Sequence, residues 1–328
     1  MGQLLKIQDL FIEYQVENER VKAVNGVSLE INEGETLGLV GETGAGKTTT
    51  ALSIMGLVPN PPGKISGGSI RYRQEEILKM RPKELRKIRG GEITMIFQDP
   101  MTSLNPVLTV GSQIMEVYRL HNRVSKLQAA IRAKEMLELV GIPGSRYNEY
   151  PYQFSGGMKQ RVMIAIALAC NPKLLIADEP TTALDVTIQA QILQLMKNLK
   201  ENFNTAMLLI THDLGVVAEV CDKVAIMYAG EIVEYGTLRD VYKDVRHPYT
   251  KGLFQSIPSM NHDSTRLETI PGMLPDPSDL PEGCKFHPRC RYCTERCKHE
   301  NPGYVALSDT HAVRCHLVSG EETTHGVH

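Results

Sequence analysis

The sequence predicts an α/β fold, and two observations lead to this prediction. Short apolar stretches with the length of buried strands occur at 35–40, 173–177 and 206–210. Stretches with helical spacing follow the first two, at 49–55 and 187–201. Alternation of this kind is typical of a sheet that is covered by helices.

A glycine-rich loop, Gly41–Thr50 with the sequence GETGAGKTTT, joins the first strand to its helix. It contains the pattern G-x-x-x-x-G-K-[ST] of a phosphate-binding loop. Glycines let consecutive backbone N–H groups point into one concavity, and the following helix presents its positive end there. We expect Lys47 to reach the β and γ oxygens of a triphosphate and Thr48 to bind Mg²⁺. The loop residues predicted to contact the nucleotide are Gly41, Thr43, Gly44, Ala45, Gly46, Lys47, Thr48 and Thr49.

Two carboxylates, Asp178 and Glu179, end the strand predicted at 173–177. At the mouth of a strand, Asp178 can hold Mg²⁺ through water, and Glu179 can polarise the water that attacks the phosphate. We therefore predict Glu179 as the catalytic base and Asp178 as a cofactor-binding residue.

Two more polar residues follow predicted strands. Gln98, after the strand at 93–97, can offer its side-chain oxygen to Mg²⁺ and to the attacking water. His212, after the strand at 206–210, can donate a hydrogen bond to a γ-phosphate. Most such glutamines are surface caps and most lone histidines are structural, so for each residue the structural interpretation stands beside the catalytic one.

A second predicted anion site begins at Ser155, which with Gly156 and Gly157 opens a helix running to Ala169. A serine and two glycines at a helix start leave a hydroxyl and N–H groups available to an anion. A capped helix with a flexible approach is the alternative. Because this helix start belongs to a different subdomain from the phosphate loop, we predict a site shared between two chains.

Two stretches of helical spacing, 109–121 and 125–140, interrupt the strand–helix alternation. We interpret residues 99–161, approximately, as an inserted helical subdomain. Ser125 is a predicted N-cap for the second helix. The apolar stripe predicted for that helix consists of Leu127, Ile131, Met136 and Leu139.

The N-terminal part reads as strands at 4–16 and 27–31. Tyr14, near the end of the first strand, can stack on an adenine ring, because an aromatic face is a good platform for a flat base. An ordinary strand aromatic is an equally good interpretation of this residue, and Phe11 is the competitor for the stacking role.

Composition and charge exclude several classes of protein. The formal net charge is −2 and no basic stripe is visible, which disfavours a general nucleic-acid binder. The longest apolar run, at 162–170, is far shorter than the roughly 20 residues of a membrane span. The first residues, MGQLLKIQDL, lack the layout of a signal peptide. The sequence therefore predicts a soluble, cytosolic protein.

Taken together and in this order, the motifs resemble those of the ATP-binding subunit of an ABC transporter. The stretch 155–160 is similar to the signature sequence of that family, with Phe154 before it for the usual Leu and Met158 for the usual Gln. The resemblance implies a RecA-like ABC ATPase core with an antiparallel β subdomain and an inserted helical subdomain. It also implies a head-to-tail dimer that holds Mg²⁺ and ATP between the phosphate loop of one subunit and Ser155–Gly157 of the other. The implied roles are adenine stacking for Tyr14, Q-loop for Gln98, Walker B for Asp178 and Glu179, D-loop for Asp185, and switch histidine for His212.

A narrower resemblance is to dipeptide and oligopeptide importers, and it rests on QDPMTSLNP at 98–106, HPYT at 247–250 and IPG at 270–272. It implies a nucleotide-binding domain over 1–256 and a C-terminal extension over 257–328. It further implies peptide import across the cytoplasmic membrane, with the chain peripheral on its cytoplasmic side. The implied partners are a second ATPase subunit (a paralogue or the same chain), two transmembrane permease subunits and, indirectly, an extracytoplasmic peptide-binding protein.

Two other functions stay open for such a chain. The same branch of the family includes importers of nickel and other small solutes. A non-transport ABC ATPase that acts on DNA or ribosomes is a more distant alternative. It is disfavoured because no heptads lie between Thr48 and Ser155, as a DNA-repair type would have, and because the chain has one cassette rather than two.

Five of the seven cysteines crowd into the stretch 284–315. In a reducing compartment, clustering of this kind points to metal rather than to disulfides. Four thiolates suit Zn²⁺ or an iron–sulfur cluster, and ligand chemistry alone does not choose between them. Resemblance to the peptide-importer branch favours a [4Fe–4S] cluster, as a structural staple or a redox sensor. Zinc and idle thiols are the alternatives. In this interpretation Cys293 is a spare, and the nearby histidines 287, 299, 311 and 316 are polar surface. The predicted ligands are Cys284, Cys290, Cys297 and Cys315.

Overall fold

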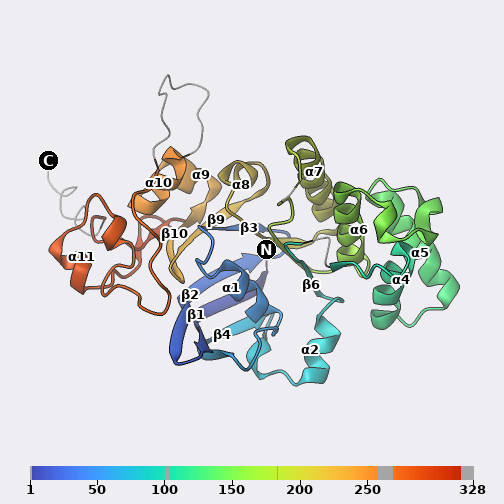
Figure 1. Ribbon diagram of the computed structural model, residues 1–328, viewed down its shortest axis with the longest axis horizontal. Helices are drawn as coiled ribbons and strands as arrows, with labels where there is room; N and C mark the ends of the chain where they lie inside the picture. Colours follow the sequence, from blue (N-terminus) through green and yellow to red (C-terminus); the bar gives the residue numbers. More distant parts are fainter. Residues whose placement is uncertain (1, 100–102, 183, 257–268, 319–328) are drawn as a thin grey trace. The chain divides into compact units, whose positions relative to one another are not determined.

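A computed structural model of the protein describes residues 2–99, 103–182, 184–256 and 269–318 (Figure 1). Residues 100–102 of the predicted stretch 98–106, and Ala183 of the predicted D-loop, lie outside this part. The chain divides into two compact units, which we describe separately. The first contains residues 1–5, 30–36 and 72–210, and the second contains residues 6–29, 37–71 and 211–328.

The first unit contains three buried parallel strands, which are β6 (Ile93–Ile96), β7 (Leu174–Asp178) and β8 (Ala206–Thr211). In their register Ile93 lies beside Leu174, which lies beside Ala206 on its other side. Strands that are covered on both faces read as continuous apolar runs, which is why the sequence predicts them well. The helices α6 (Gly156–Leu168) and α7 (Val186–Phe203) pack on each other, and α6 also packs on β6.

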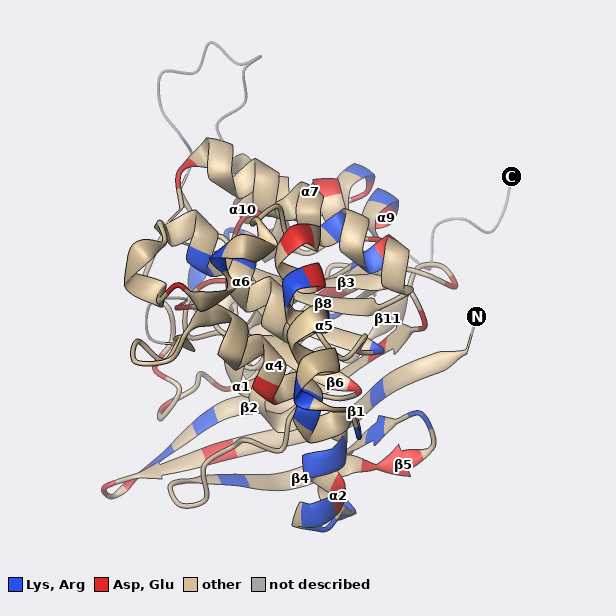
Figure 2. Cartoon of the chain, turned by 90° about the vertical axis from the view of Figure 1, so that its right-hand side faces the viewer, with Lys and Arg blue, Asp and Glu red and all other residues tan. Residues whose placement is uncertain are grey.

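The short helix α2 (Pro82–Ile88) of the first unit is charged and buries none of its residues. In Figure 2 the ribbon of α2 carries blue Lys and Arg positions, and the ribbon of β5 (Glu75–Glu76) carries red acidic positions. A one-turn 3₁₀ helix, η1 (Ile77–Lys79), lies between them in the sequence. This agrees with the short charged helix that the sequence predicts at 82–89.

The predicted helical insertion contains α4 (Val110–His121), α5 (Lys126–Leu139) and the 3₁₀ helices η2 (Gly144–Asn148) and η3 (Pro151–Gln153). Each long helix begins as predicted, because the hydroxyls of Thr109 and Ser125 accept hydrogen bonds from the backbone N–H groups of the third helical residues. Val110 and Ile114 bury one face of α4.

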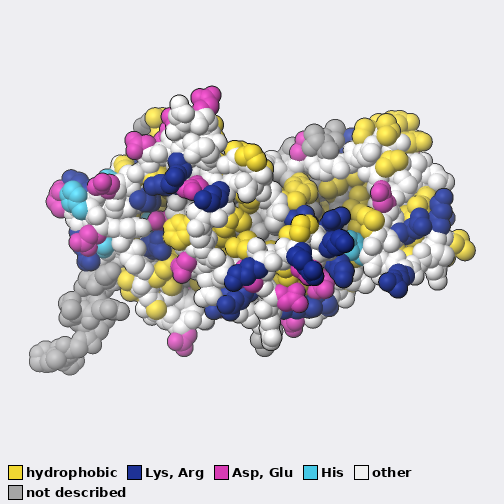
Figure 3. Space-filling view, turned by 90° about the horizontal axis from the view of Figure 1, so that it is seen from below, with side chains coloured by type: hydrophobic (Ala, Val, Ile, Leu, Met, Phe, Trp, Pro, Cys, Tyr) yellow, Lys and Arg dark blue, Asp and Glu magenta, His cyan; other side chains and the backbone are white. Residues whose placement is uncertain are grey.

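The predicted apolar stripe of α5 is wrong for three of its four members. Leu127, Ile131 and Leu139 are 72%, 50% and 41% exposed, and only Met136 is buried. The helix buries a different face, built around Ala129 and Ala133, against α4 and α6. Met136 and Leu137 belong to the same buried face, so helical spacing alone does not show which apolar residues make the contact. Figure 3 shows hydrophobic side chains gathered on the exposed surface of this helical part.

The second unit contains one parallel pair and one hairpin that share a strand. Strand β3 (Thr36–Val40) runs parallel to β9 (Lys223–Tyr228), with Leu37 beside Lys223. Strand β10 (Glu231–Thr237) returns antiparallel to β9. Ala229 and Gly230, both with positive φ, make the two-residue turn that matches the twist of the strands. The sequence itself predicts strands at 223–228 and 231–234 joined through these two residues, and this hairpin is confirmed.

The described tail residues extend this sheet beyond β10. Strand β12 (Ala312–Val313) pairs antiparallel with β10, and β11 (Val305–Ala306) pairs antiparallel with β12. A small apolar cluster forms beneath them from Val313, Cys315 and Val318. The tail's helical elements are η4 (His287–Arg289) and α11 (Glu295–His299).

The prediction that the tail histidines are polar surface is wrong for one of them, which is buried. His311 is 4% exposed, and its Nε2 lies 3.0 Å from the Glu234 Oε1 atom of β10. Glu234 also accepts the backbone N–H groups of Arg246 and His247. A buried carboxylate needs such partners, and sequence spacing does not reveal them. His311 therefore joins the tail to the sheet.

The N-terminal strands form a hairpin. Strand β1 (Gln3–Val16) is joined to β2 (Glu19–Asn32) by a two-residue turn, and β4 (Gly63–Tyr72) is the other neighbour of β1. The remaining helices of the second unit are α1 (Lys47–Ile54), α8 (Leu214–Val220), α9 (Leu238–Lys243) and α10 (Pro248–Gln255). Among the residues that the structure describes, no helix combines the length and apolar character needed to span a membrane.

Candidate nucleotide site

The phosphate loop lies in the second unit, between β3 and α1, as predicted. The Lys47 Nζ atom donates hydrogen bonds to the backbone oxygens of Gly41, at 2.7 Å, and Glu42, at 3.0 Å. The Lys47 side chain is buried, and the helix begins at this residue. Lys47, which the sequence predicts to reach the phosphates, therefore bridges two backbone oxygens of its own loop.

Two positions of the loop require glycine because the neighbouring backbone leaves no room for a Cβ atom. A Cβ atom on Gly41 would lie 2.1 Å from the backbone oxygen of Met227 in β9. A Cβ atom on Gly46 would lie 2.3 Å from the backbone oxygen of Ala23, and Gly46 has a φ of +100°, in the left-handed region. The loop thus fits closely against β9 and β2, which only glycine permits at these two positions.

The other predicted loop residues differ in exposure: Thr43, Gly44 and Thr48 are exposed, Thr49 is half-buried and Ala45 is buried. The backbone oxygen of Ala45 accepts the Gly230 N–H at 3.0 Å, which ties the loop to the β9–β10 turn. Thr48, predicted to bind Mg²⁺, is thus an exposed residue in the first turn of α1.

The two aromatic candidates on β1 lie in different surroundings. Tyr14 is half-buried, and its ring edge lies 2.8 Å from the position of a Cβ atom on Gly63. Phe11 is 44% exposed and packs over Gly26 and Gly67. Each aromatic side chain lies beside a glycine, where the absence of a side chain leaves room for it.

Gln98 and Glu179, predicted separately, meet in the first unit. The Gln98 Nε2 atom donates to the Glu179 Oε2 atom at 2.9 Å, and the Thr182 hydroxyl donates to the same oxygen at 3.0 Å. Glu179 has a φ of +46°, and its N–H donates to the Ile210 oxygen of β8. Asp178, at the end of β7, is 3% exposed. At these strand ends, the Glu179 carboxylate therefore accepts hydrogen bonds from Gln98 and Thr182 on one of its oxygens.

The remaining predicted residues lie at helix starts. Ser155 caps α6 and accepts the Met158 N–H at 3.4 Å. Asp185 caps α7 and accepts the Ile188 N–H at 2.9 Å. A Cβ atom on Gly157 would lie 2.6 Å from the Ile188 Cγ2 atom, so this glycine also serves the packing of α6 on α7. His212 is exposed and directly follows β8.

Three residues around the loop are missing from the sequence prediction. Arg289 of the tail forms a salt bridge with Glu42 inside the phosphate loop, with 2.8 Å between Arg289 Nη1 and Glu42 Oε2. The hydroxyl of Tyr249, in α10, accepts the Glu42 N–H at 3.1 Å. The signal in the sequence is Glu42 itself: an acidic residue in a loop predicted to bind anions favours a nearby cation, but the pattern does not say which one.

The tail contains the four cysteines that are predicted to bind a metal or cluster. Cys284, Cys290, Cys297 and Cys315 are all free thiols. Burial, together with the nearby thiols of Cys297, Cys315 and Cys290, raises the pKa of Cys284 to about 12. Within the described residues, no group of three or more Cys, His, Asp or Glu side chains is placed to hold a metal ion. The donor chemistry therefore fits a metal or cluster, while the arrangement of the thiols does not form a ligand set.

Comparison with known proteins identifies the class. The ABC transporter family model matches residues 24–182. A second model, described as Oligopeptide/dipeptide transporter, C-terminal region, matches residues 233–297. This chain belongs to the ABC transporter family, and it is an ATPase that binds ATP.

Within that family, the chain is similar to ATP-binding proteins of peptide transporters. It is 50% identical to the oligopeptide transport ATP-binding protein AppD of Bacillus subtilis (strain 168), over 98% of each chain. It is 46% identical to the dipeptide transport ATP-binding protein DppD of Escherichia coli (strain K12), over 95% of this chain and 96% of that one. The resemblance recognised from the motifs is confirmed.

Solved structures confirm the predicted fold class. A dimeric structure of a post-hydrolysis state of the ATP-binding cassette MJ0796, bound to ADP and Pi, matches with a TM-score of 0.65 and 31% identity. That match covers 72% of this chain and 99% of the cassette. A second match, to cbiO1 from Clostridium perfringens, has a TM-score of 0.64 and 26% identity, covering 74% of this chain and 92% of cbiO1.

Proposed function

We propose that this chain is the ATP-hydrolysing subunit that powers import of dipeptides or oligopeptides, acting on the cytoplasmic side of the cytoplasmic membrane. The observation that carries the proposal is the similarity over almost the whole chain, at 50% identity, to an oligopeptide transport ATP-binding protein. The match of residues 233–297 to the C-terminal region of oligopeptide/dipeptide transporters supports it independently.

The proposed nucleotide roles are those that the sequence motifs imply for each residue. The phosphate loop holds the triphosphate, with Lys47 on the β and γ oxygens and Thr48 on Mg²⁺. Glu179 is the base for the attacking water, and its contact with Gln98 supports their joint action on that water. Asp178 holds Mg²⁺ through water, His212 contacts the γ-phosphate and Tyr14 stacks on adenine.

The working unit is a head-to-tail dimer. In this arrangement the partner subunit presents its own serine–glycine helix start to the γ-phosphate, and this chain offers Ser155 and Gly157 in return. The dimeric structure of the MJ0796 cassette supports this arrangement. ATP binds the closed dimer better than the open one and so shifts the population toward closure, which hydrolysis reverses. Two permease subunits then follow this cycle, and a paralogous ATPase is the proposed partner in the cell.

Transport by a reconstituted complex tests the proposal. The chain is purified from its native host with its bound membrane subunits and placed in vesicles together with the extracytoplasmic peptide-binding protein. We expect ATP-dependent uptake of a radiolabelled dipeptide or pentapeptide. Uptake of Ni²⁺ without peptide uptake would reassign the cargo. An ATPase that binds no membrane subunit and is stimulated by DNA or ribosomes would overturn the transport function.

We also propose a [4Fe–4S] cluster on Cys284, Cys290, Cys297 and Cys315, with Zn²⁺ as the alternative. The support is that all four thiols are free and lie in one short segment, where the other three contribute to the raised pKa of Cys284. When bound, the cluster would staple a segment too small for a core of its own. The alternative role is redox sensing.

Metal analysis of protein purified without oxygen tests the cluster. We expect about four irons and four acid-labile sulfides per chain, as a Cys₄-held [4Fe–4S] cluster requires. The Cys297→Ser variant should lose this iron and show protease-sensitive tail residues. Cys170→Ser, outside the tail, is the matched control. One zinc and no sulfide would replace the cluster by zinc, and an ordered tail in Cys297→Ser would reject the staple.

A further inference from the structure

The tail contacts the phosphate loop through a two-pronged ion pair. Arg289, next to the proposed ligand Cys290, donates from Nη1 to the Glu42 Oε2 atom at 2.8 Å and from Nη2 to Oε1 at 3.2 Å. The Arg289 side chain is 5% exposed and that of Glu42 is 28% exposed. A bidentate contact of this kind fixes the orientation of the carboxylate and also neutralises its charge. The two residues are 247 positions apart in the sequence.

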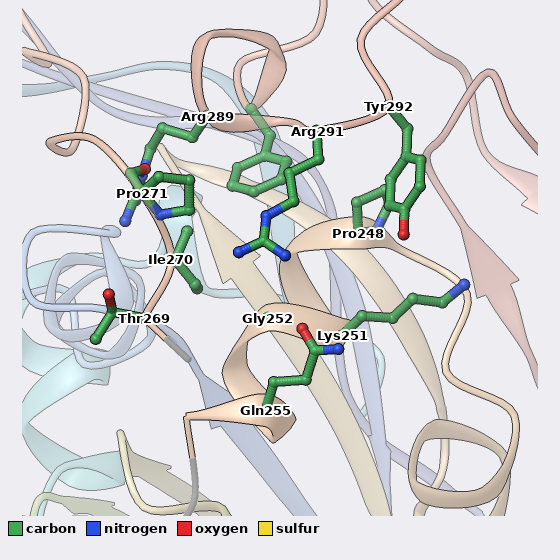
Figure 4. A pocket seen from close by; sticks show the side chains of 11 residues that line it. Pro248, Lys251, Gly252, Gln255, Thr269, Ile270, Pro271, Arg289, Arg291 and Tyr292 are labelled. Atoms are coloured by element: carbon green, nitrogen blue, oxygen red, sulfur yellow. The ribbon is translucent and has the colours of Figure 1, made fainter. Parts of the chain in front are cut away.

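Two other residues of the second unit contact the guanidinium group of Arg289. Its Nε atom donates to the Pro271 backbone oxygen at 3.0 Å, and its Cζ atom lies 5.8 Å from the centre of the Tyr228 ring. Figure 4 shows Arg289 beside Pro271 at the edge of a pocket in this unit. Phe286, also in the tail, packs edge-on against the Tyr228 ring, with 5.2 Å between the ring centres. The tail therefore presents a pre-oriented cation to the loop.

Glu42 links this cation to the lysine of the loop. Its side chain is held by Arg289, and its N–H donates to the Tyr249 hydroxyl. Its backbone oxygen accepts from Lys47 Nζ at 3.0 Å and from the Ala45 N–H at 3.2 Å. A shift of Glu42 would consequently move an oxygen that holds the Lys47 ammonium group.

We infer that Arg289 is a positioning residue for the phosphate loop, through which the C-terminal tail sets the affinity for ATP. Arg289 does so in two ways: it fixes the orientation of Glu42, and it neutralises a carboxylate that would otherwise repel an incoming triphosphate. The inference rests on the proposed role of the loop in binding ATP.

ATP affinity in a set of full-length variants tests this inference, measured with a fluorescent ATP analogue and by steady-state kinetics. Arg289→Met should weaken binding about 10- to 100-fold, the range for loss of a hydrogen bond to a charged group. KM should rise to match, whereas kcat at saturating ATP should stay within about two-fold, because uniform binding is lost. Arg296→Met, which removes an exposed tail pair with Glu300, is the matched control and should bind as the wild type does.

The double variant Glu42→Gln/Arg289→Met separates the effect of the unpaired carboxylate from a simple loss of structure. It removes the unpaired carboxylate, so ATP affinity should recover to within about five-fold of wild type. Binding in the double variant that is as weak as in Arg289→Met would overturn the inference. If Arg289→Met does not fold, Arg289→Lys decides: it keeps the charge but loses the fork, and unchanged affinity there would reject positioning.

The failure of this inference can be told from failure of the proposed function. Lys47→Ala serves as the reference, since its binding defect depends on the loop alone. If Lys47→Ala loses ATP and Arg289→Met does not, the loop binds ATP but the tail does not position it. If Lys47→Ala binds ATP normally, the loop assignment itself is wrong and the inference falls with it.

Discussion

Replacing Glu179 by glutamine is expected to stop ATP turnover while ATP binding stays intact. A glutamine has the same shape and still offers an oxygen to Gln98 and Thr182, which both donate to Glu179 Oε2. It cannot take a proton from water, and loss of a general base typically lowers the rate about 10²- to 10⁴-fold. We expect a fall of at least about 100-fold in kcat, with an unchanged dissociation constant for ATP.

The matched control is Glu201→Gln, an exposed change near the end of α7. It should hydrolyse ATP at the wild-type rate. In the Glu179→Gln protein, ATP binding is followed by a filter assay and phosphate release by a coupled assay. Phosphate release at more than about a tenth of the wild-type rate would remove Glu179 from the role of base.

The Lys47→Ala substitution is expected to have the next largest effect, on ATP binding. Lys47 supplies the positive charge of the loop and bridges the backbone oxygens of Gly41 and Glu42. Loss of one charged hydrogen bond weakens binding about 10- to 100-fold, and Lys47 is expected to make more than one with the phosphates. The measurement is a titration with ATP and Mg²⁺.

The control for this variant is Lys83→Ala on the exposed helix α2, which removes a lysine that does not belong to the loop. Because Lys47 is itself buried, thermal unfolding is measured for both proteins. A Lys47→Ala protein with a normal Tm and weakened binding supports the assignment. Normal ATP binding in that protein would contradict it.

The elements that the sequence predicts well have local causes. Strands β6 and β7 are continuous apolar runs, and Thr109 and Ser125 cap their helices with their own hydroxyls. The turn at Ala229 and Gly230 is likewise local. Propensity, capping and periodicity act within a few residues, so a single sequence contains them.

The features that the sequence does not predict depend on distant partners. The buried face of α5 is set by its packing on α4 and α6, which buries Ala129, Ala133 and Leu137 but leaves Leu127 and Leu139 exposed. His311 is buried because Glu234, 77 positions away, faces it. Arg289 likewise finds Glu42 only in the folded chain. Spacing reveals which residues share a face, but not which residue will stand opposite.

The pairing of β12 with β10 has a consequence for solubility. Tyr235 and Glu234 of β10 lie beside Ala312 and Val313, and the Arg314 N–H donates to the Val233 oxygen. Without this partner, β10 would present an unsatisfied row of backbone groups, which is a template for pairing with another chain. Strands β11 and β12 thus cover the edge of the sheet at β10. A protein shortened before residue 305 would expose β10 as an edge strand and be prone to self-association. The tail therefore protects the hairpin that supports the phosphate loop from intermolecular pairing.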